Sequence, residues 1–309
     1  MFLPPRRLAA LIAASTLALA ACSGGSSSSS GSVSAPPGSK MTKVGVAVTG
    51  AFGEKPTMAV PKTAAPKDLS SEVLSQGTGS SVASGQTLIV NYLGETWDLK
   101  DGKPNVFDNS YDRKQVAGFP IGTGKVIEGW DKTLVGQKVG SRVLLSIPPA
   151  DAYSSGELAG KTLLFVVDVV AAINPDAAAT GTPVTGLPAG MPTVDSKPGK
   201  KPVITSVKGV KAGPNPVSAL LLQGIGAPID ATKTLAVQVV QTDAATGKQT
   251  QETWGSALQV IPAQQVVAAL SALKKARVGC RVVAVLPADN TSGNQMPASV
   301  VVVDVIGQY

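Results

Sequence analysis

The chain is 309 residues long and carries 27 Lys and Arg against 20 Asp and Glu, a formal net charge of +7. That length is enough for two domains of ordinary size. The basic residues are scattered, without a basic block or interleaved aromatics, which argues against nucleic acid as a partner. Because the sequence has no histidine, it lacks the commonest metal ligand and the usual general base. We therefore disfavour a hydrolase or metalloenzyme and expect neither a metal nor a cofactor.

The chain begins with a segment typical of export signals. Two arginines, Arg6 and Arg7, precede an apolar stretch, residues 8–21, that is too short to span a bilayer as a helix. This stretch runs into Leu19-Ala20-Ala21-Cys22, which resembles a bacterial lipobox, where the signal is removed and the cysteine sulfur receives a diacylglycerol. We expect residues 1–21 to be a signal peptide and Cys22 to anchor the protein at the extracytoplasmic face of the cell membrane. The alternative is an ordinary cleavage site with an incidental cysteine.

Two stretches of small and polar residues suggest the domain boundaries. Residues 22–43 combine the lipidated cysteine with a Ser/Gly-rich tether, and residues 174–201 form an Ala, Gly, Pro and Thr-rich linker. The tether precedes the first predicted domain, residues 57–173, and the linker separates it from the second, residues 202–309.

The two predicted domains repeat each other in sequence. Gln76-Gly77-Thr78-Gly79 returns as Gln223-Gly224-Ile225-Gly226, and Val139-Gly140-Ser141-Arg142-Val143 returns as Val278-Gly279-Cys280-Arg281-Val282. The order of such matches is kept along the chain, so we expect one fold to occur twice.

The elements expected in each copy indicate an α+β fold. Residues 87–94, 142–147 and 162–170 are short runs rich in Val, Ile and Leu, typical of antiparallel strands. Residues 128–135 place Trp130 and Leu134 four apart, which suits a short amphipathic helix, and residues 263–276 predict a helix at the same place in the second copy. Each copy is expected to be a curled antiparallel β-sheet wrapped around a short α-helix.

Several motifs of the first copy occur together in a known order. They are Val90-Asn91-Tyr92-Leu93-Gly94, Phe107-Asp108-Asn109-Ser110, Gly124-Lys125-Val126-Ile127-Glu128-Gly129-Trp130-Asp131 and Thr162-Leu163-Leu164-Phe165. In this order and spacing the first copy resembles an FKBP-type peptidyl-prolyl cis-trans isomerase domain over nearly its whole length.

The resemblance implies an apolar pocket that takes a proline ring and the residue before it, in unfolded or partly folded exported polypeptides. It implies catalytic roles for Asp108, Tyr153 and Tyr92, and an ion pair of Arg113 with Asp108. The side chains implied as substrate-binding are Phe107, Val126, Ile127, Trp130 and Phe165. Taken singly these residues have plainer interpretations, since Trp130 with Leu134 is typical of a core stripe and Asp108 with Arg113 of a surface ion pair.

The first copy also departs from the family pattern. Ala117 stands where many members carry a further wall aromatic, while Phe119 falls at a neighbouring, more structural position. The segment 153–162 is shorter than the proline-bearing flap of the best-known members. These departures weaken the expectation of macrolide inhibitor binding more than that of isomerisation.

The second copy keeps the scaffold pattern without the pocket residues. By sequence, Tyr92 becomes Val239, Trp130 becomes Ala269 and Phe165 becomes Val301. Tyr153 becomes Thr291 or Ser292, and the Phe107-Asp108 pair falls near Thr253 and Trp254. We therefore expect residues 202–309 not to catalyse. The rival hypothesis is a surface lipoprotein that uses both copies as docking modules, with catalysis vestigial in each.

Overall fold

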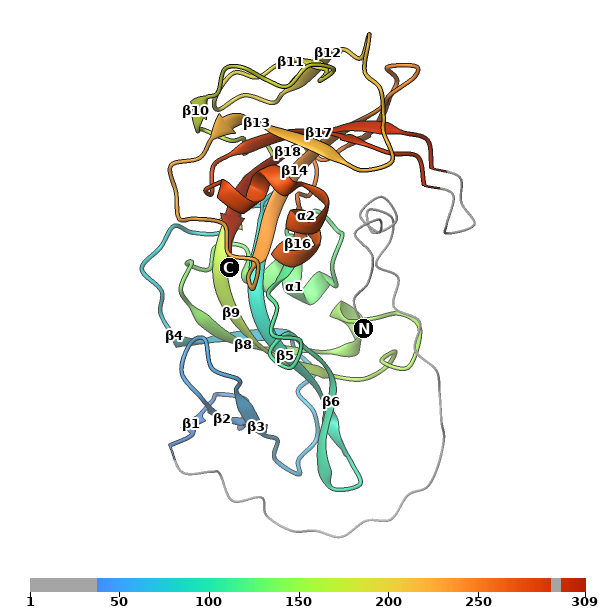
Figure 1. Cartoon of the computed structure of the whole chain (residues 1–309). Coiled ribbons are helices and arrows are strands. Elements are labelled where there is room, and N and C mark those ends of the chain that lie inside the picture. The colour runs from blue at the N-terminus through green and yellow to red at the C-terminus, as the bar shows by residue number, and fades with distance from the viewer. Residues whose placement is uncertain (1–37, 290–295) are drawn as a thin grey trace. The chain divides into compact units, whose positions relative to one another are not determined.

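The computed structural model describes residues 38–289 and 296–309. The predicted signal peptide, Cys22, and Thr291 and Ser292 lie outside these residues. The described chain divides into two compact units at Ile173/Asn174, called here the first unit (38–173) and the second unit (174–309). Figure 1 shows the elements of each unit. None of the helices among the described residues is long and apolar enough to cross a membrane.

The first unit is built on an antiparallel sheet in the order β4-β8-β9-β5-β6, with β7 beside β5. Its elements are β1 (Lys40–Met41), β2 (Ala47–Thr49), β3 (Thr57–Ala59), β4 (Ser70–Ser75), β5 (Thr87–Lys100), β6 (Lys103–Asn109), β7 (Ala117–Pro120), α1 (Glu128–Leu134), β8 (Arg142–Ile147), a 3₁₀ turn (Pro149–Asp151) and β9 (Leu163–Ile173). The predicted antiparallel sheet with one short helix is confirmed in this unit.

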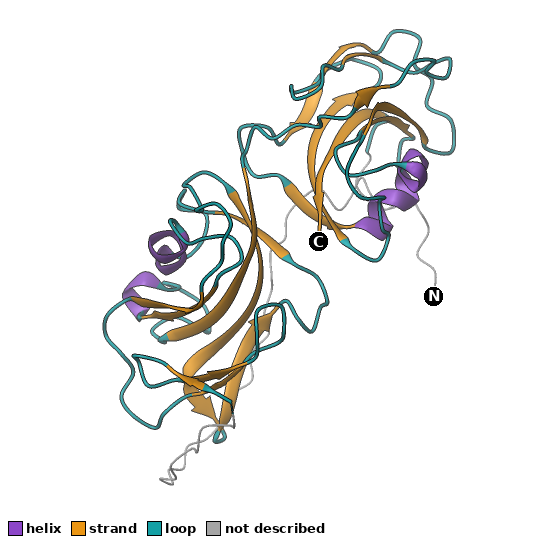
Figure 2. Ribbon diagram, turned by 90° about the vertical axis from the view of Figure 1, so that its left-hand side faces the viewer, coloured by secondary structure: helices purple, strands orange, loops and turns teal. Residues whose placement is uncertain are grey.

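The main core of the first unit lies between the inner face of this sheet and α1. Trp130 and Leu134 from the helix pack against Tyr92, Val143 and Phe165 from three strands, and all five are buried. Figure 2 shows the curved strands with the helix against one face. The four-residue spacing of Trp130 and Leu134 therefore places both side chains on the sheet, as the amphipathic pattern predicts.

Residues 40–60, which we call the strap, cover the outer face of the same sheet. The strands β1, β2 and β3 form a small antiparallel sheet, whose buried residues Val46, Val48 and Met58 join a second core cluster with Leu144 and Leu164. The strap is thus part of the folded unit, whereas the sequence suggested a tether to residue 43 and a domain from residue 57. Short strands between glycine turns have the composition of a linker, and only the sheet face against which they pack identifies them as part of the domain.

A buried ion pair holds the strap to the sheet. Arg142 and Asp168 lie opposite each other on β8 and β9, and Arg142 Nε donates to Asp168 Oδ1 over 2.6 Å with both side chains buried. The guanidinium also donates to the carbonyls of Gly50 and Glu54, and the Gly53 amide donates to Asp168 Oδ2. Charge-assisted bonds of this kind are short and strong, so the pair anchors the strap by its backbone.

The second unit repeats this topology. Its sheet runs β10-β13-β17-β18-β14-β15, with β16 beside β14, so apart from β10 the order matches that of the first unit strand for strand. Its elements are β10 (Thr182–Pro183), β11 (Thr193–Asp195), β12 (Val203–Ser206), β13 (Val217–Gln223), β14 (Thr234–Asp243), β15 (Gln249–Glu252), β16 (Gln259–Pro262), α2 (Ala263–Ala269), a 3₁₀ turn (Ser271–Lys275), β17 (Arg281–Leu286) and β18 (Ser299–Gln308). The predicted linker 174–201 contains β10 and β11 and belongs to this unit.

The ion pair is repeated too. Arg281 and Asp304 are opposite each other on β17 and β18, fully buried and 2.6 Å apart. Arg281 donates to the carbonyls of Lys197 and Lys200, as Arg142 does to Gly50 and Glu54. Because Lys200 takes the place of Glu54, the Gly-x-Lys-Pro segments at 53–56 and 199–202 are equivalent in space as well as in sequence.

The helix of the second unit is shorter than the sequence indicates. An α-helix over residues 263–276 is wrong, because α2 ends at Ala269 and a 3₁₀ turn follows a break at Leu270 (φ −114°, ψ 80°). In this unit β16 runs directly into α2, whereas residues 121–127 separate β7 from α1. Periodicity alone does not distinguish an α-helix from a 3₁₀ turn.

Candidate functional site

Five aromatic side chains from five elements meet on the inner face of the first unit. The ring centroids of Tyr92 and Trp130 are 5.7 Å apart, those of Trp130 and Phe165 5.3 Å, and those of Phe107 and Phe165 5.4 Å, all edge to face. Tyr92, Trp130 and Phe165 are buried and Phe107 is half-buried. The structure thus brings together four predicted site residues that lie up to 73 positions apart (165 − 92).

Phe119 is the fifth ring, which the sequence analysis placed at a structural position beside the pocket. Its centroid lies 5.1 Å from that of Trp130 and 5.9 Å from that of Tyr92, and its side chain is half-buried. Ala117, two residues earlier on β7, also packs against this cluster. The alternation of β7 was the signal for Phe119, since residues two apart share a face of the sheet.

Gly94 makes room for two of these rings. It follows Tyr92 by two positions on β5 and faces the same side of the sheet. A Cβ at Gly94 would lie 2.7 Å from Phe107 and 2.9 Å from Phe165, closer than side chains tolerate. The glycine is therefore required by the aromatic cluster rather than by a turn.

A polar group borders the cluster. The carboxylate of Asp108 accepts hydrogen bonds from the Tyr92 hydroxyl and from Arg113, and Arg113 Nη2 donates to the Tyr92 hydroxyl over 3.0 Å. Burial, and then the hydrogen bond to Asp108, raises the pKa of Tyr92 above its ordinary value. Although desolvation lowers it, the hydrogen bonds to Asp108 and Tyr92 raise the pKa of Arg113. The predicted Arg113–Asp108 ion pair is present, with Tyr92 as its third member.

Val126 and Ile127 lie just before α1, both half-buried and packed against the aromatic cluster. The turn that leads to them is held by Asp131, whose carboxylate accepts from the amides of Gly122 (2.6 Å) and Gly124 (2.7 Å). Both glycines have positive φ, 72° and 70°, a conformation that favours glycine. Asp131 was not among the predicted site residues, although an acidic residue in the first turn of a helix after a Gly-x-Gly turn was an available signal.

Tyr153 stands at the exposed edge of this site. It follows the 3₁₀ turn after β8, is 43% exposed and makes no hydrogen bond to any described residue. Burial of its ring, and then the negative charge of Asp108, raises the pKa of the Tyr153 hydroxyl. The phenol is therefore protonated at neutral pH and lies close enough to Asp108 to sense its charge, so its O–H remains available to donate.

Residues 109–113, which we call the rim loop, connect the site to the strap. The Tyr111 hydroxyl donates to Asp168 Oδ2 over 3.0 Å and accepts from Arg142 over 3.1 Å. Lys55 of the strap forms an ion pair with Asp112 at 2.6 Å. The loop that carries Arg113 is thus fixed to the buried ion pair. No sequence signal pointed to Tyr111, because its partners lie far away in the chain.

The second unit has aliphatic or polar residues at the matching positions. Val239 pairs with Val303 as Tyr92 pairs with Val167, and Val301 pairs with Gln241 as Phe165 pairs with Gly94. Val239, Ala269 and Val301 all belong to a core cluster without aromatic rings. The predicted replacements of Tyr92 and Phe165 are confirmed by this register, and the described residues of the second unit form no aromatic floor at these positions.

The predicted match of Phe107-Asp108 to Thr253 and Trp254 is wrong. Asp108 lies opposite Gly94 and Gln251 lies opposite Gln241, so Thr250 and Gln251 take the two places. The hairpin is shorter in the second unit: Asp108 follows Gly94 by 14 positions (108 − 94), whereas Gln251 follows Gln241 by 10 (251 − 241). Counting along the sequence cannot locate that deletion.

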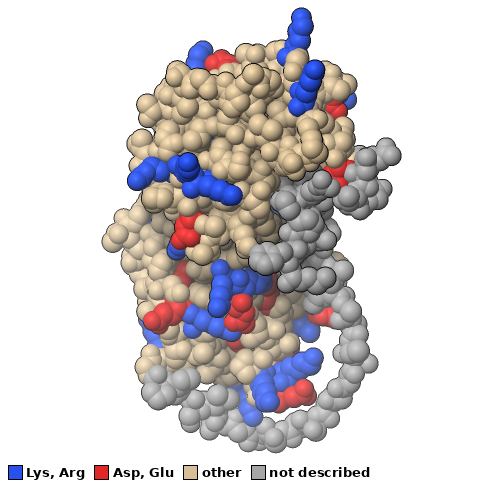
Figure 3. Space-filling model, viewed as in Figure 1, with Lys and Arg blue, Asp and Glu red and all other residues tan. Residues whose placement is uncertain are grey.

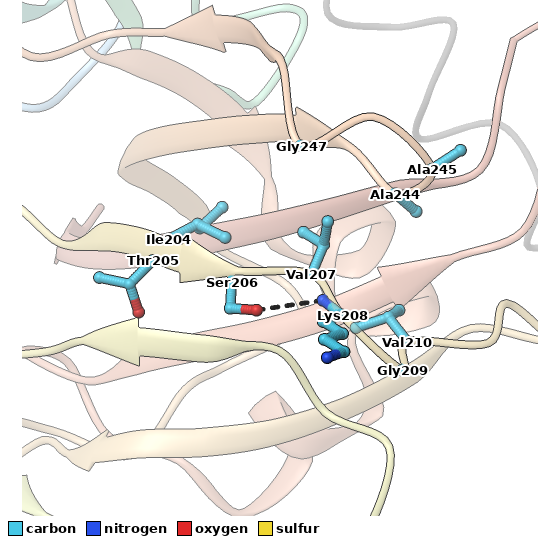
Figure 4. A pocket seen from close by; sticks show the side chains of 10 residues that line it. All are labelled: Ile204, Thr205, Ser206, Val207, Lys208, Gly209, Val210, Ala244, Ala245 and Gly247. Carbon is cyan, nitrogen blue, oxygen red and sulfur yellow. Dashed lines mark hydrogen bonds between the residues drawn. The ribbon is translucent and has the colours of Figure 1, made fainter.

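Charged side chains of both signs are interspersed over the first unit in the face shown in Figure 3, consistent with ion pairs such as Lys55–Asp112 and Lys132–Glu128. A surface hollow of about 570 Å³ lies in the second unit, between residues 204–210 and the turn at 244–247 (Figure 4). None of the predicted site residues lines it.

The first unit contains the part of the chain that is similar to known proteins. Residues 79–170 match the family model of the FKBP-type peptidyl-prolyl cis-trans isomerases. A probable FK506-binding protein of Corynebacterium glutamicum is 37% identical over 123 residues, which cover 99% of that protein and 38% of this chain. This chain belongs to the FKBP-type peptidyl-prolyl cis-trans isomerase family. It is thus a peptidyl-prolyl isomerase, and proline-containing polypeptides are its substrates.

Two further proteins are similar to parts of this chain. An FK506-binding protein of Streptomyces anulatus is 38% identical over 124 residues, 97% of that protein and 38% of this chain. Among solved structures, FkpA from Escherichia coli is 28% identical with a TM-score of 0.29, covering 45% of this chain and 53% of that one. The family match lies wholly within the first unit, where the aromatic cluster is found.

Proposed function

We propose that the first unit is the catalytic part of this FKBP-type protein and accelerates X-Pro isomerisation in exported polypeptides at the extracytoplasmic face of the membrane. The observation that carries the proposal is the contact between the buried ring of Tyr92 and the Asp108–Arg113 pair, because it places an apolar surface and a polar edge side by side. The catalytic and binding roles of the individual residues are part of this proposal.

The reaction needs little more than such a surface. An X-Pro bond isomerises slowly, over tens to hundreds of seconds, because rotation removes amide resonance. The planar amide is the more charge-separated form and is favoured by water. Transfer of the bond onto the rings of Trp130, Phe107 and Phe165 would weaken that preference and so favour the twisted transition state.

The polar edge would hold the chain while the bond turns. The Tyr153 hydroxyl has a free O–H that can donate to a substrate carbonyl, and such preorganised donors stabilise developing charge. Asp108 is held by Tyr92 and Arg113 and would act on the backbone beside the proline. No proton needs to leave the enzyme in this scheme, in keeping with the raised pKa of both tyrosines.

The second unit would not catalyse, since Val239, Ala269 and Val301 give no aromatic floor. This unit also favours the rival function, in which both FKBP-type units serve as docking modules of a surface lipoprotein. Macrolide binding by the first unit would be weak, because Ala117 provides less wall than an aromatic ring.

The experiment is exchange NMR of an apolar-X-Pro peptide with the full chain in detergent. The variants are Asp108→Val and Trp130→Ala, with Gln251→Val as the matched control at the equivalent position of the second unit. We expect the rate enhancement to fall about tenfold or more in the first two, equivalent to about 1.4 kcal/mol of transition-state stabilisation, and to be unchanged in the control. Lack of acceleration by the parent chain would instead favour the docking function.

Membrane attachment is tested separately. Detergent phase partitioning and labelling with a radioactive fatty acid are compared between the parent and Cys22→Ser. We expect the parent to carry the label and partition with the detergent, and the variant to lose both. An unlabelled parent would remove Cys22 and the membrane face from the proposal.

A further inference from the structure

The hollow of the second unit lies on the outer face of its sheet. Its lining includes Ile204, Val207, Val210 and Ala244. Ile204, Val207, Val210 and Ala244 are only partly buried against the cluster formed by Leu221 and its neighbours on the sheet. Figure 4 shows the Val207 side chain pointing from the 204–210 segment towards the turn that carries Ala244.

Ala244 occupies the place that Trp97 occupies in the first unit. Glu95 pairs with Leu164 on β9 as Thr242 pairs with Val300 on β18. Two residues later, the Trp97 amide donates to the Thr162 carbonyl and the Ala244 amide to the Ala298 carbonyl, both over 2.9 Å. The strand register therefore makes Ala244 the counterpart of Trp97.

In the first unit that place is filled by an indole. Trp97 is 4% exposed and packs with Met58 and Val60 in the cluster beneath the strap. Its Nε1 donates to the carbonyl of Thr63 over 2.9 Å. Met58 pairs with Val48 as Ile204 pairs with Val194, and Ala59 pairs with Ala47 as Ser206 pairs with Thr193. Residues 58–63 therefore correspond to residues 204–210, with one extra residue in the second unit, and residues 204–210 form the other wall of the hollow. The hollow therefore lies where a tryptophan side chain is packed in the first unit.

No tryptophan of this chain is free to fill it. The chain has three: Trp97 and Trp130 are buried in the first unit, and Trp254 is buried in the second, at 8% exposure. We propose that the hollow binds the tryptophan side chain of another polypeptide, with the ring against Val207, Val210 and Ala244. The second unit would then be a binding unit for aromatic segments, independent of the isomerase site.

The experiment uses the full chain in detergent and a glycine-flanked peptide carrying 5-fluorotryptophan, observed by line broadening in ¹⁹F NMR. Ala244→Trp restores the residue that the first unit has and fills the hollow, while Ile225→Trp, at an exposed position of the same unit, is the matched control. We expect the peptide signal to broaden with the parent and with Ile225→Trp, and to stay sharp with Ala244→Trp.

A second variant, Val210→Asp, places a charge in the wall without filling the hollow and is expected to abolish the broadening as well. Free 5-fluoroindole is the further arm. Broadening that persists in Ala244→Trp and Val210→Asp, or no broadening with the parent, would overturn the site. Broadening by free fluoroindole alone would overturn the polypeptide as its occupant.

Discussion

The two units share their framework and differ in the side chains that meet on its inner face. The strand order, the paired Gly140 and Gly279 turns and the buried Arg–Asp pairs are common to both. The first unit adds aromatic rings and Asp108, whereas the second has Val239, Val301 and Gln251 in those registers. Under the proposed function, activity depends on this set of side chains, and the second unit shows that the framework folds without them.

The largest expected effect comes from the buried ion pairs, which test whether the two frameworks depend equally on their Arg–Asp contact. Besides its arginine, Asp168 accepts from Tyr111 and from the Gly53 amide, whereas Asp304 accepts from the Ala179 amide. We expect Arg281→Met to destabilise the second unit by about 3–5 kcal/mol, because it leaves a buried carboxylate without its partner. Arg142→Met should cost the first unit less, since Tyr111 remains.

Hydrogen exchange of each unit, followed by mass spectrometry, measures both losses. The control is Arg281→Met combined with Asp304→Leu, which removes both charges and should recover most of the stability. Equal losses in the two units would mean that Tyr111 adds nothing to the framework.

A second difference between the units is Glu95, whose place is taken by Thr242 in the second unit. Glu95 is buried, at 3% exposure. Burial raises its pKa to about 7, although Lys55 acts to lower it. The folded state then holds a proton that the unfolded chain, with a pKa near 4.5, has released. Stability of the first unit is therefore highest below about pH 4.5 as far as this group is concerned, and falls as pH rises through about 7.

We expect Glu95→Gln to remove this dependence and to stabilise the first unit by about 3 kcal/mol at pH 8, from a difference of about 2.5 pKa units. Thermal unfolding at pH 5 and pH 8 measures it, with the exposed Glu157→Gln as control. If the stability of the variant depended on pH as that of the parent does, the raised pKa of Glu95 would be contradicted.

The smallest effect concerns Tyr111. Tyr111→Phe loses two hydrogen bonds to the buried pair and should cost the first unit about 1 kcal/mol, together with a modest loss of isomerase activity through the rim loop. Tyr153→Phe is the contrasting variant, because an exposed hydroxyl without a partner should affect activity and leave stability unchanged. Denaturant unfolding and the peptide exchange assay separate the two.

The sequence predicts the parts of this molecule that depend on local order. Tyr92, Trp130 and Phe165 could be assigned, and their counterparts Val239 and Val301 located, because the strands that carry them keep their spacing in both copies. The counterpart of Asp108 in the second unit could not be found, because the β14–β15 hairpin is four residues shorter than the β5–β6 hairpin. No local sequence pattern shows where those four residues are missing.

Contacts between segments that are distant in the chain could not be predicted from the sequence either. Val46, Val48 and Met58 lie among glycine turns and form strands only because a sheet face is there to cover. Tyr111 has its role through Asp168, and the strand register that makes Ala244 the counterpart of Trp97 appears only in the fold. In each case the deciding partner is more than 50 residues away in the chain.

Gly94 shows what an isomerase site in the second unit would require. Its missing Cβ admits Phe107 and Phe165, and the second unit carries Gln241 at that register. Aromatic rings introduced there would collide with the glutamine unless it were first replaced by glycine, and a lone glycine would only weaken the strand. An attempt to build an isomerase site in the second unit should therefore begin with Gln241→Gly.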